Sequence, residues 1–295
     1  MPQATPAFAD AIERAGGSVA DLAPDVTGLV WTDYHQPALL HETLAKNPQL
    51  EWVQLPFAGV DAFASILDAP VRFTSAKGAY AEPVAEHALA LCLALGRAIP
   101  ERVLATSWGQ KFAVSLYESR VLVVGGGGIT EELVRLLAPF RCPVTVVRKN
   151  PSISIGDQTL GFEKLDEQLG LADFVIIAAA LTAETMGLFD ARRLALMKPS
   201  AFLVNIARGK HVVTDDLVNA LTSGVIAGAG LDVTEPEPLP TGHKLWSVKN
   251  CIITPHTADT PEQVTRMLAQ RIHANVLAFH GEGHWIGLVD PKAGY

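Results

Sequence analysis

The sequence is poor in cysteine, and none of its cysteines is placed for a metal site or a disulfide framework. Cys92, Cys142 and Cys251 are odd in number and far apart, with no CxxC pair and no neighbouring histidine cluster. Secreted disulfide-rich domains and zinc modules instead show closely spaced, usually even, cysteines. We therefore expect three inert thiols, a reducing cytoplasmic location and no bound metal.

Long apolar runs and an excess of basic residues are also missing. The longest apolar run, Ala88 to Leu95, is far shorter than the ~20 residues that span a bilayer. The N-terminal segment MPQATPAFADAIER has no basic stretch followed by an apolar core, so a signal peptide is not expected. The net charge of -8 opposes binding to nucleic acid or to an anionic membrane surface. The expected partner is a small molecule, with no nucleic acid and no membrane.

Internal repeats and low-complexity tracts are absent as well, and short apolar segments alternate with helical ones along the chain. The 295 residues are 49% hydrophobic, which is enough for one large or two modest cores. Six apolar segments predict strands, at 120–124, 143–147, 173–177, 201–205, 225–231 and 251–254. Strands that alternate with helices are typical of a parallel sheet built from βαβ units. We predict an α/β protein with a doubly wound, Rossmann-type domain.

A second, smaller α/β set comes before this domain, and we expect a flavodoxin-like fold for it. It would contain one helix and three short strands, at 6–15, 28–31, 51–55 and 71–74. A long apolar helix at 81–97 would join the two domains, and a final helix at 261–279 would return to the smaller one. The predicted division is 1–95 with 266–295 for the smaller, discontinuous domain and 96–265 for the Rossmann domain.

A glycine-rich turn, LVVGGGGIT, closes one predicted strand and opens a helix. This is the context of a dinucleotide-binding loop, in which the first glycine permits a tight turn and the second admits a pyrophosphate. Gly125 and Gly127 take these positions, and Gly128, Ile129 and Thr130 begin the helix whose N–H groups attract phosphate. Thr130 replaces the third glycine, so its hydroxyl would cap the helix, reach a phosphate, or hold strand and helix slightly apart. Methyltransferases use related loops, so the turn alone leaves the chemistry open.

The next strand ends in Arg148, Lys149 and Asn150, which bear on the choice of dinucleotide. About 20 residues after the glycine loop, NAD-specific domains present Asp or Glu to the ribose hydroxyls. Two cations there can instead hold a ribose 2′-phosphate, and the alternative interpretation is a solvated basic turn. We predict NADP(H) as the preferred cofactor, with NAD(H) still possible.

Three residues of the second half would together serve hydride transfer at a carbon that carries a carboxylate. They are Arg208 in NIARG, Glu237 in LDVTEPEP and His256 in TPHTAD. Arginine offers a planar, permanently charged fork for a carboxylate. Histidine supplies a proton near neutral pH, and a paired glutamate would favour the imidazolium and fix its ring.

The order of these residues and the motifs around them resemble the D-isomer-specific 2-hydroxyacid dehydrogenase family, over nearly the whole chain. The resemblance implies that Arg208 binds the substrate carboxylate and that Glu237 pairs with His256. It also implies that His256 donates the proton in reduction and accepts it in oxidation. Asp232 would contact the nicotinamide carboxamide, and Ala207 would belong to the cofactor site.

The family's substrate loop is matched by FAGVD, in the smaller domain. By resemblance, Phe57, Ala58 and Gly59 would bind substrate there, with backbone N–H groups facing the carboxylate. Relatives usually open with a β-strand, whereas this chain begins almost directly with a helix. We therefore expect the smaller sheet to be one strand short or to borrow pairing from elsewhere.

The function implied is an NADP(H)-dependent oxidoreductase acting between a 2-oxoacid and a D-2-hydroxyacid, with glyoxylate or hydroxypyruvate as the first choices. The alternative is a non-catalytic, dinucleotide-sensing protein on the same scaffold, as corepressor relatives are. A homodimer is expected from the resemblance, with the helix after Ala81 and the segment near Trp108 at its interface. His87, early in that helix, is expected to be structural or interfacial.

Overall fold

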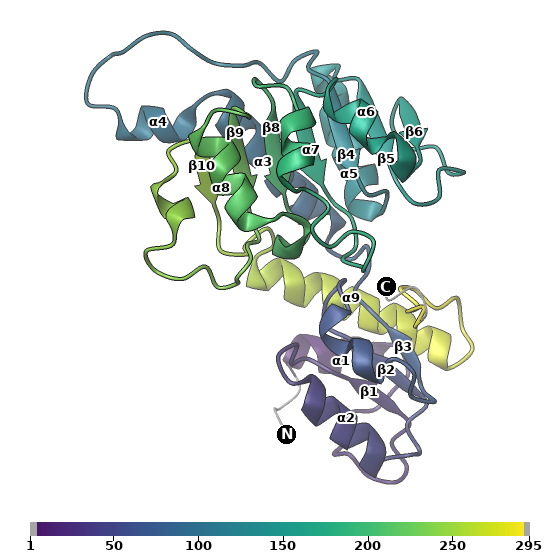
Figure 1. Cartoon of the computed structure of the whole chain (residues 1–295). Helices are drawn as coiled ribbons and strands as arrows, with labels where there is room; N and C mark the ends of the chain where they lie inside the picture. The colour runs from purple at the N-terminus through teal and green to yellow at the C-terminus, as the bar shows by residue number, and fades with distance from the viewer. Residues whose placement is uncertain (1–4, 292–295) are drawn as a thin grey trace. The chain divides into compact units, whose positions relative to one another are not determined.

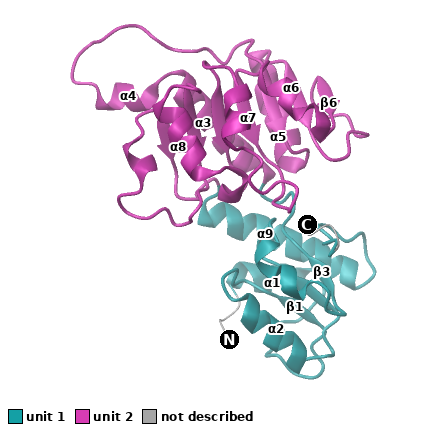
Figure 2. Ribbon diagram, viewed as in Figure 1, with its two compact units in different colours: residues 1–80, 259–295 teal, residues 81–258 magenta. Residues whose placement is uncertain are grey.

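Residues 5–291 are described by the computed structural model, and the chain divides into two units (Figure 2). The smaller unit consists of residues 1–80 and 259–295, and the larger one of residues 81–258. The smaller unit is therefore discontinuous in sequence.

The larger unit is built on a parallel sheet of seven strands (Figure 1). Its strands are β4 (Val121–Val124), β5 (Val144–Val147), β6 (Gln158–Leu160), β7 (Phe174–Ile177), β8 (Phe202–Asn205), β9 (Gly228–Leu231) and β10 (Cys251–Ile253). Their order in the sheet is β10-β9-β8-β7-β4-β5-β6. The chain starts in the interior at β4, runs outward through β5 and β6, and returns to β7 on the other side. This reversal of direction at β4 is the place where open α/β sheets bind ligands.

The inner strands β4, β5, β7 and β8 are almost wholly apolar because both faces of the sheet are buried there. Val121 and Val123 point into one core, and Leu122 and Val124 point into the other. Successive side chains of a strand face opposite sides, so every residue of β4 is removed from water. This burial explains why β4, β5, β7 and β8 could be recognised from the sequence.

Helices cover both faces of the large sheet. The first core contains side chains of α3 (Ala81–Gly96) and α5 (Gly128–Leu137). The second core contains side chains of α6 (Leu165–Leu169), α7 (Ala191–Leu196) and α8 (Thr214–Thr222). The short helix α4 (Ile99–Leu104) has no buried residue. Four 3-10 turns complete the unit: η2 (Ala138–Phe140), η3 (Phe162–Lys164), η4 (Gly209–His211) and η5 (Lys244–Ser247).

The smaller unit has a parallel sheet of three strands among its described residues, in the order β1-β2-β3. Its elements are α1 (Pro6–Arg14), β1 (Gly28–Val30), α2 (Pro37–Lys46), β2 (Trp52–Gln54), η1 (Asp61–Ile66), β3 (Arg72–Thr74) and α9 (Pro261–Phe279). The outer edge of β3 pairs with the C-terminal segment, because the Ser75 N–H donates to the Gly287 carbonyl (2.7 Å) and the Val289 N–H to the Phe73 carbonyl (3.1 Å). The sheet thus borrows pairing from the chain's far end.

The boundaries between the units lie at 80/81 and 258/259, whereas the sequence predicted 95/96 and 265/266. Helix α3 belongs wholly to the larger unit because its apolar face packs in the core beside α5. Helix α9 belongs wholly to the smaller unit, where Asn275 Nδ2 donates to Gln54 Oε1 at 2.8 Å. Within residues 5–291, no helix is both long and apolar enough to cross a membrane.

Candidate active site

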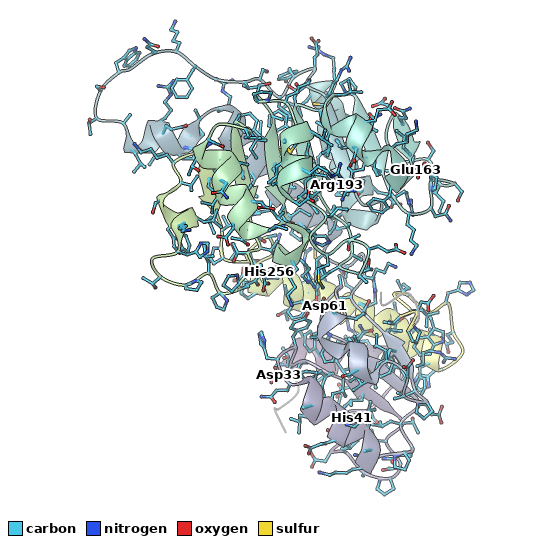
Figure 3. All side chains as sticks on the ribbon, in the orientation of Figure 1. Asp33, His41, Asp61, Glu163, Arg193 and His256 are labelled. Atoms are coloured by element: carbon cyan, nitrogen blue, oxygen red, sulfur yellow. The ribbon has the colours of Figure 1, made fainter. Side chains whose placement is uncertain are left out.

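His256, labelled in Figure 3, stands in the loop after β10 and pairs with Glu237. Its Nδ1 lies 2.6 Å from Oε1 of Glu237. A carboxylate only accepts hydrogen bonds, so Nδ1 carries a proton and Nε2 is the ring nitrogen left for a substrate. The two side chains are 48% and 39% exposed, so a small molecule can reach them.

The pair shifts both pKa values toward the charged forms. The hydrogen bond that His256 donates to Glu237 is the main reason that the pKa of His256 is raised above 6.5, and it outweighs the opposing effects of burial and of Arg208. Burial favours the neutral form of Glu237, but the hydrogen bond and charge of His256, with help from Thr234 N–H and Arg208, lower its pKa below 4.5. The pair therefore favours the protonated, imidazolium form of His256 above its ordinary pKa range.

Arg208 follows β8 and lies close enough to act electrostatically on both members of the pair. Its Nη1 donates to the Ala207 carbonyl at 2.8 Å, and its own carbonyl accepts from Asn205 Nδ2 at 2.9 Å. The Ala207 N–H donates to Asn205 Oδ1 at 3.1 Å, which closes this turn. Arg208, Glu237 and His256 thus meet at the carboxyl ends of neighbouring strands.

Asp232, directly after β9, is buried beneath this group. Its Oδ1 accepts from the Thr254 hydroxyl at 2.6 Å and from the Thr257 N–H at 2.9 Å, and its Oδ2 accepts from the Ala258 N–H at 3.2 Å. Burial raises its pKa, but hydrogen bonds from His87, Thr254 and Thr257 outweigh it, so the pKa lies below 3.8. The Asp232 carboxylate thus binds the backbone of the loop that carries His256. Contact of Asp232 with a nicotinamide stays a prediction.

The glycine loop has the backbone that a dinucleotide requires. Gly125 has φ +115°, and a β-carbon there would lie 2.5 Å from the carbonyl atoms of Ala178. A β-carbon on Gly127 would meet no described atom within 4 Å, so this face of the turn is open to a phosphate. Helix α5 begins at Gly128, with its N-terminal N–H groups at the same place. The residues present fit a bound dinucleotide.

Thr130 is fully buried, and its hydroxyl donates to the Gly125 carbonyl at 2.9 Å. The hydroxyl therefore does not cap α5, and a contact of Thr130 with a phosphate stays a prediction. The hydroxyl instead closes the turn between β4 and α5, which gives a polar link where the fingerprint has a third glycine.

The three residues after β5 have different surroundings. The guanidinium stem of Arg148 covers Gly126, where a β-carbon would lie 2.6 Å from Arg148 Cδ. Lys149 is ion-paired with Glu184 at 2.8 Å, and Asn150 Oδ1 accepts from the Ser152 N–H at 3.1 Å. Arg148 thus lies over the glycine loop, whereas the Lys149 charge is partly compensated. No local sequence pattern indicates the pairing of Lys149 with Glu184, which lies 35 residues further along the chain.

Phe57, Ala58 and Gly59 lie in the smaller unit, in the partly buried segment between β2 and η1. The Phe57 ring packs edge-on against Tyr34, with centroids 5.4 Å apart. The Tyr80 hydroxyl donates to the Pro56 carbonyl at 2.8 Å and so fixes the start of the loop. Binding of substrate by these three residues stays a prediction.

The cysteines are free thiols in apolar surroundings. Burial raises the pKa of Cys92 and of Cys251 to about 12, and that of Cys142 to about 11. A thiol with so high a pKa is a poor nucleophile at neutral pH. Residues 5–291 also contain no group of three His, Cys, Asp or Glu side chains that could hold a metal ion.

Comparisons with known proteins identify the family of the chain. Residues 88–258 match the family model of the D-isomer specific 2-hydroxyacid dehydrogenase, NAD binding domain. The human glyoxylate reductase/hydroxypyruvate reductase is 33% identical over 247 residues, which cover 79% of this chain and 75% of that protein.

Two solved structures match the chain over nearly its whole length. A D-isomer specific 2-hydroxyacid dehydrogenase from Xanthobacter autotrophicus Py2, in complex with NADPH and MES, matches 100% of this chain and 97% of its own, with 30% identity and a TM-score of 0.86. An NADPH-dependent glyoxylate/hydroxypyruvate reductase from Sinorhizobium meliloti, in complex with NADP and sulfate, matches 97% and 96%, with 25% identity and a TM-score of 0.78. The chain belongs to the D-isomer-specific 2-hydroxyacid dehydrogenase family and is a hydride-transferring oxidoreductase of 2-hydroxyacids.

Proposed function

We propose that this enzyme reduces small 2-oxoacids, glyoxylate and hydroxypyruvate first among them, with NADPH. The observation that carries the proposal is the 2.6 Å pair of His256 and Glu237 beside Arg208, which combines a proton donor with a cation for a carboxylate. The human and Sinorhizobium relatives bear the names of enzymes for these two substrates.

Arg208, His256 and Glu237 would each have a different role in the reduction. Reduced nicotinamide, when bound, supplies the hydride. Arg208 would hold the substrate carboxylate, which places the neighbouring ketone near His256. His256 would donate the Nε2 proton to the carbonyl oxygen as negative charge develops there. Glu237 would stay ionised and accept a hydrogen bond from the Nδ1–H of His256, which keeps the proton on Nδ1 and fixes the ring throughout.

The preference for NADPH rests on Arg148, whose side chain lies over the glycine loop. A guanidinium at this point can bind the 2′-phosphate that distinguishes NADPH from NADH. We expect the KM for NADPH to be at least about tenfold lower than the KM for NADH, which corresponds to roughly 1.4 kcal/mol. Equal values, or a lower KM for NADH, would contradict the assignment.

The decisive experiment is an NADPH oxidation assay with a panel of 2-oxoacids, run beside His256→Ala and Arg208→Ala. Loss of the proton donor should lower kcat by roughly 10² to 10⁴. Loss of the carboxylate clamp should mainly raise KM. The proposal fails if the wild-type enzyme reduces no member of the panel, or if His256→Ala keeps full activity.

We also propose a homodimer, formed through the segment from α4 to Tyr117. Figure 1 shows this segment as a long loop that leaves the body of the larger unit after α4. Its apolar side chains are exposed: Val103 by 75%, Leu104 by 80%, Trp108 by 92% and Phe112 by 52%. An apolar stretch of this extent is typical of a subunit interface, and a second copy of the chain would cover it.

A further inference from the structure

His87, in the second turn of α3, contacts two residues of the active-site region. Its Nε2 lies 2.9 Å from Thr254 Oγ1 and 3.4 Å from Asp232 Oδ1. The His87 side chain is only 20% exposed, and that of Asp232 only 1%. Thr254 immediately follows β10 and stands two residues before His256. His87 thus reaches from α3 to the base of the loop that carries the proton donor.

The direction of these hydrogen bonds follows from what each group can donate. The Thr254 hydroxyl has one proton, and its 2.6 Å contact with an ionised carboxylate must use that proton. The hydroxyl can then only accept from His87, so Nε2 of His87 carries a hydrogen. The result is a chain in which His87 donates to Thr254 and Thr254 donates to Asp232.

The end of this chain holds the catalytic loop in shape. The Asp232 carboxylate accepts the N–H groups of Thr257 and Ala258, and its carbonyl accepts the N–H of His256 at 2.8 Å. His256 itself has φ +52°, a left-handed backbone that residues other than glycine rarely adopt. A conformation of this kind persists only where the surrounding contacts define it.

We propose that His87 and Thr254 are positioning residues of this enzyme: by donating toward the Asp232 carboxylate, they hold the 254–258 loop so that His256 meets Glu237. The proposal rests on the proposed function for its effect on turnover, and on geometry alone for its effect on His256. Loss of the His87 donor would leave the Thr254 hydroxyl free to turn away from Asp232. The loop would then lose part of its anchor, and the His256–Glu237 contact would loosen.

His87 and Ala258, which both interact with Asp232, lie near the two ends of the larger unit. The larger unit begins at Ala81, shortly before His87, and ends at Ala258, whose N–H is bound by Asp232. Asp232 therefore joins, within this unit, the two segments through which the chain enters and leaves it. A single buried carboxylate thereby ties both segments to the proton donor.

The test compares variants that remove the donor with variants that restore it. His87→Ala removes the donor, and His87→Gln restores one, because glutamine Nε2 is the same number of bonds from Cα as histidine Nε2. Thr254→Val and Thr254→Ser are the matching pair on the second residue. His41→Gln, on the exposed surface of α2, is the control.

Two readouts separate this proposal from the proposed function. The pKa of His256, followed by NMR in the enzyme without substrate, should fall toward 6.5 in His87→Ala and Thr254→Val and recover in His87→Gln and Thr254→Ser. With a reducible 2-oxoacid, kcat should fall by roughly 10- to 100-fold in the first two variants while KM changes little. If no 2-oxoacid is reduced, the proposed function fails and the NMR result still decides this one.

Outcomes against the proposal are equally specific. A folded His87→Ala with an unchanged His256 pKa would overturn it, as would equal losses in His87→Gln and His87→Ala, since the side chain's shape would then matter more than its donor. Should His87→Ala fail to fold, the Thr254→Val and Thr254→Ser pair decides by the same criteria, because valine keeps the shape of threonine.

Discussion

Gly209 and Thr234 approach one another backbone to backbone, with no room for a side chain on Gly209. The contact brings the turn that carries Arg208 against the loop that carries Glu237. Arg208 and Glu237 follow different strands, and a β-carbon on Gly209 would push their two loops apart. The close approach is thus a precondition of the active site as well as of the fold.

Gly209→Ala should therefore reduce both stability and activity. Overpacking of this kind costs typically about 1–3 kcal/mol, which would appear as a lower Tm, and displacement of Glu237 should lower kcat. Thermal unfolding and NADPH oxidation measure the two effects. Gly170→Ala is the matched control, since a β-carbon there would make an ordinary 3.5 Å contact with the Leu196 carbonyl. Unchanged Tm and kcat in Gly209→Ala would refute the prediction.

The pH dependence of reduction should follow the protonation of His256. Because Glu237 raises the His256 pKa, kcat/KM for a 2-oxoacid should fall only as the pH rises through a value above 6.5. In Glu237→Gln the charge that favours imidazolium is gone, so this alkaline limb should move to lower pH. Glu235→Gln, which changes an exposed neighbour in the same loop, should leave the limb in place. A limb that does not move in Glu237→Gln would show that His256 is not the titrating donor.

The contact between His256 and Glu237 should also stabilise the fold, within a limited pH range. The Glu237 pKa is lowered on folding, so its contribution is present above about pH 4.5 and lost as the pH falls through the lowered value. The His256 pKa is raised, so its contribution is complete below pH 6.5 and lost as the pH rises through the raised value. A double-mutant cycle of the two residues should give a coupling of roughly 0.5–1 kcal/mol at pH 5.5, because both side chains are partly exposed. The coupling should be smaller at pH 9, and a larger one there would contradict the sign argued here.

Glu184 should weaken the proposed preference for NADPH. Its carboxylate neutralises Lys149 beside Arg148 and would repel a nearby 2′-phosphate. Glu184→Gln should lower the KM for NADPH a few-fold and leave that for NADH unchanged, and Arg148→Ala should raise the KM for NADPH alone. Glu167→Gln, which breaks an exposed ion pair with Lys164, serves as the control. A change of equal size for both cofactors in Glu184→Gln would rule out a role at the 2′-phosphate.

Trp108→Glu should dissociate the proposed dimer. A charge at the most exposed apolar residue of the α4 segment would have to be buried without a partner on association. Light scattering after gel filtration should show a dimer for the wild-type enzyme and a monomer for the variant. Trp246→Glu, at a 53% exposed tryptophan outside that segment, should remain dimeric. A monomeric wild type would refute the proposal directly.

The large sheet could be predicted because β4, β5, β7 and β8 are buried on both faces and are therefore runs of mostly apolar residues. Strand β6 was not predicted, since it is a three-residue edge strand with an exposed glutamine. The short helix α4 was not predicted either, because none of its residues is buried. The apolar residues of α4 therefore do not show the spacing of a helix with one buried face.

His256, Glu237 and Arg208 could be singled out from the sequence because each stands in a local motif after a strand, and the structure brings the three side chains close together. His87 was assigned only a structural or interfacial position, and its contact with Thr254 joins residues 167 positions apart in the chain. No local pattern marks such a contact. The same holds for Lys149 and Glu184, whose pairing depends on how two loops fold and not on either loop's own sequence.

The left-handed backbone of His256 decides how a catalytically dead form of this enzyme should be made. Alanine at this position removes the imidazole but also disfavours φ +52°, so its effect mixes lost chemistry with a changed loop. Asparagine adopts positive φ far more readily than other non-glycine residues. His256→Asn should therefore keep the loop's shape without a proton to give, and the difference between the two variants measures the backbone contribution. Such a protein is suited to trapping an unreacted ketoacid with NADPH for crystallography.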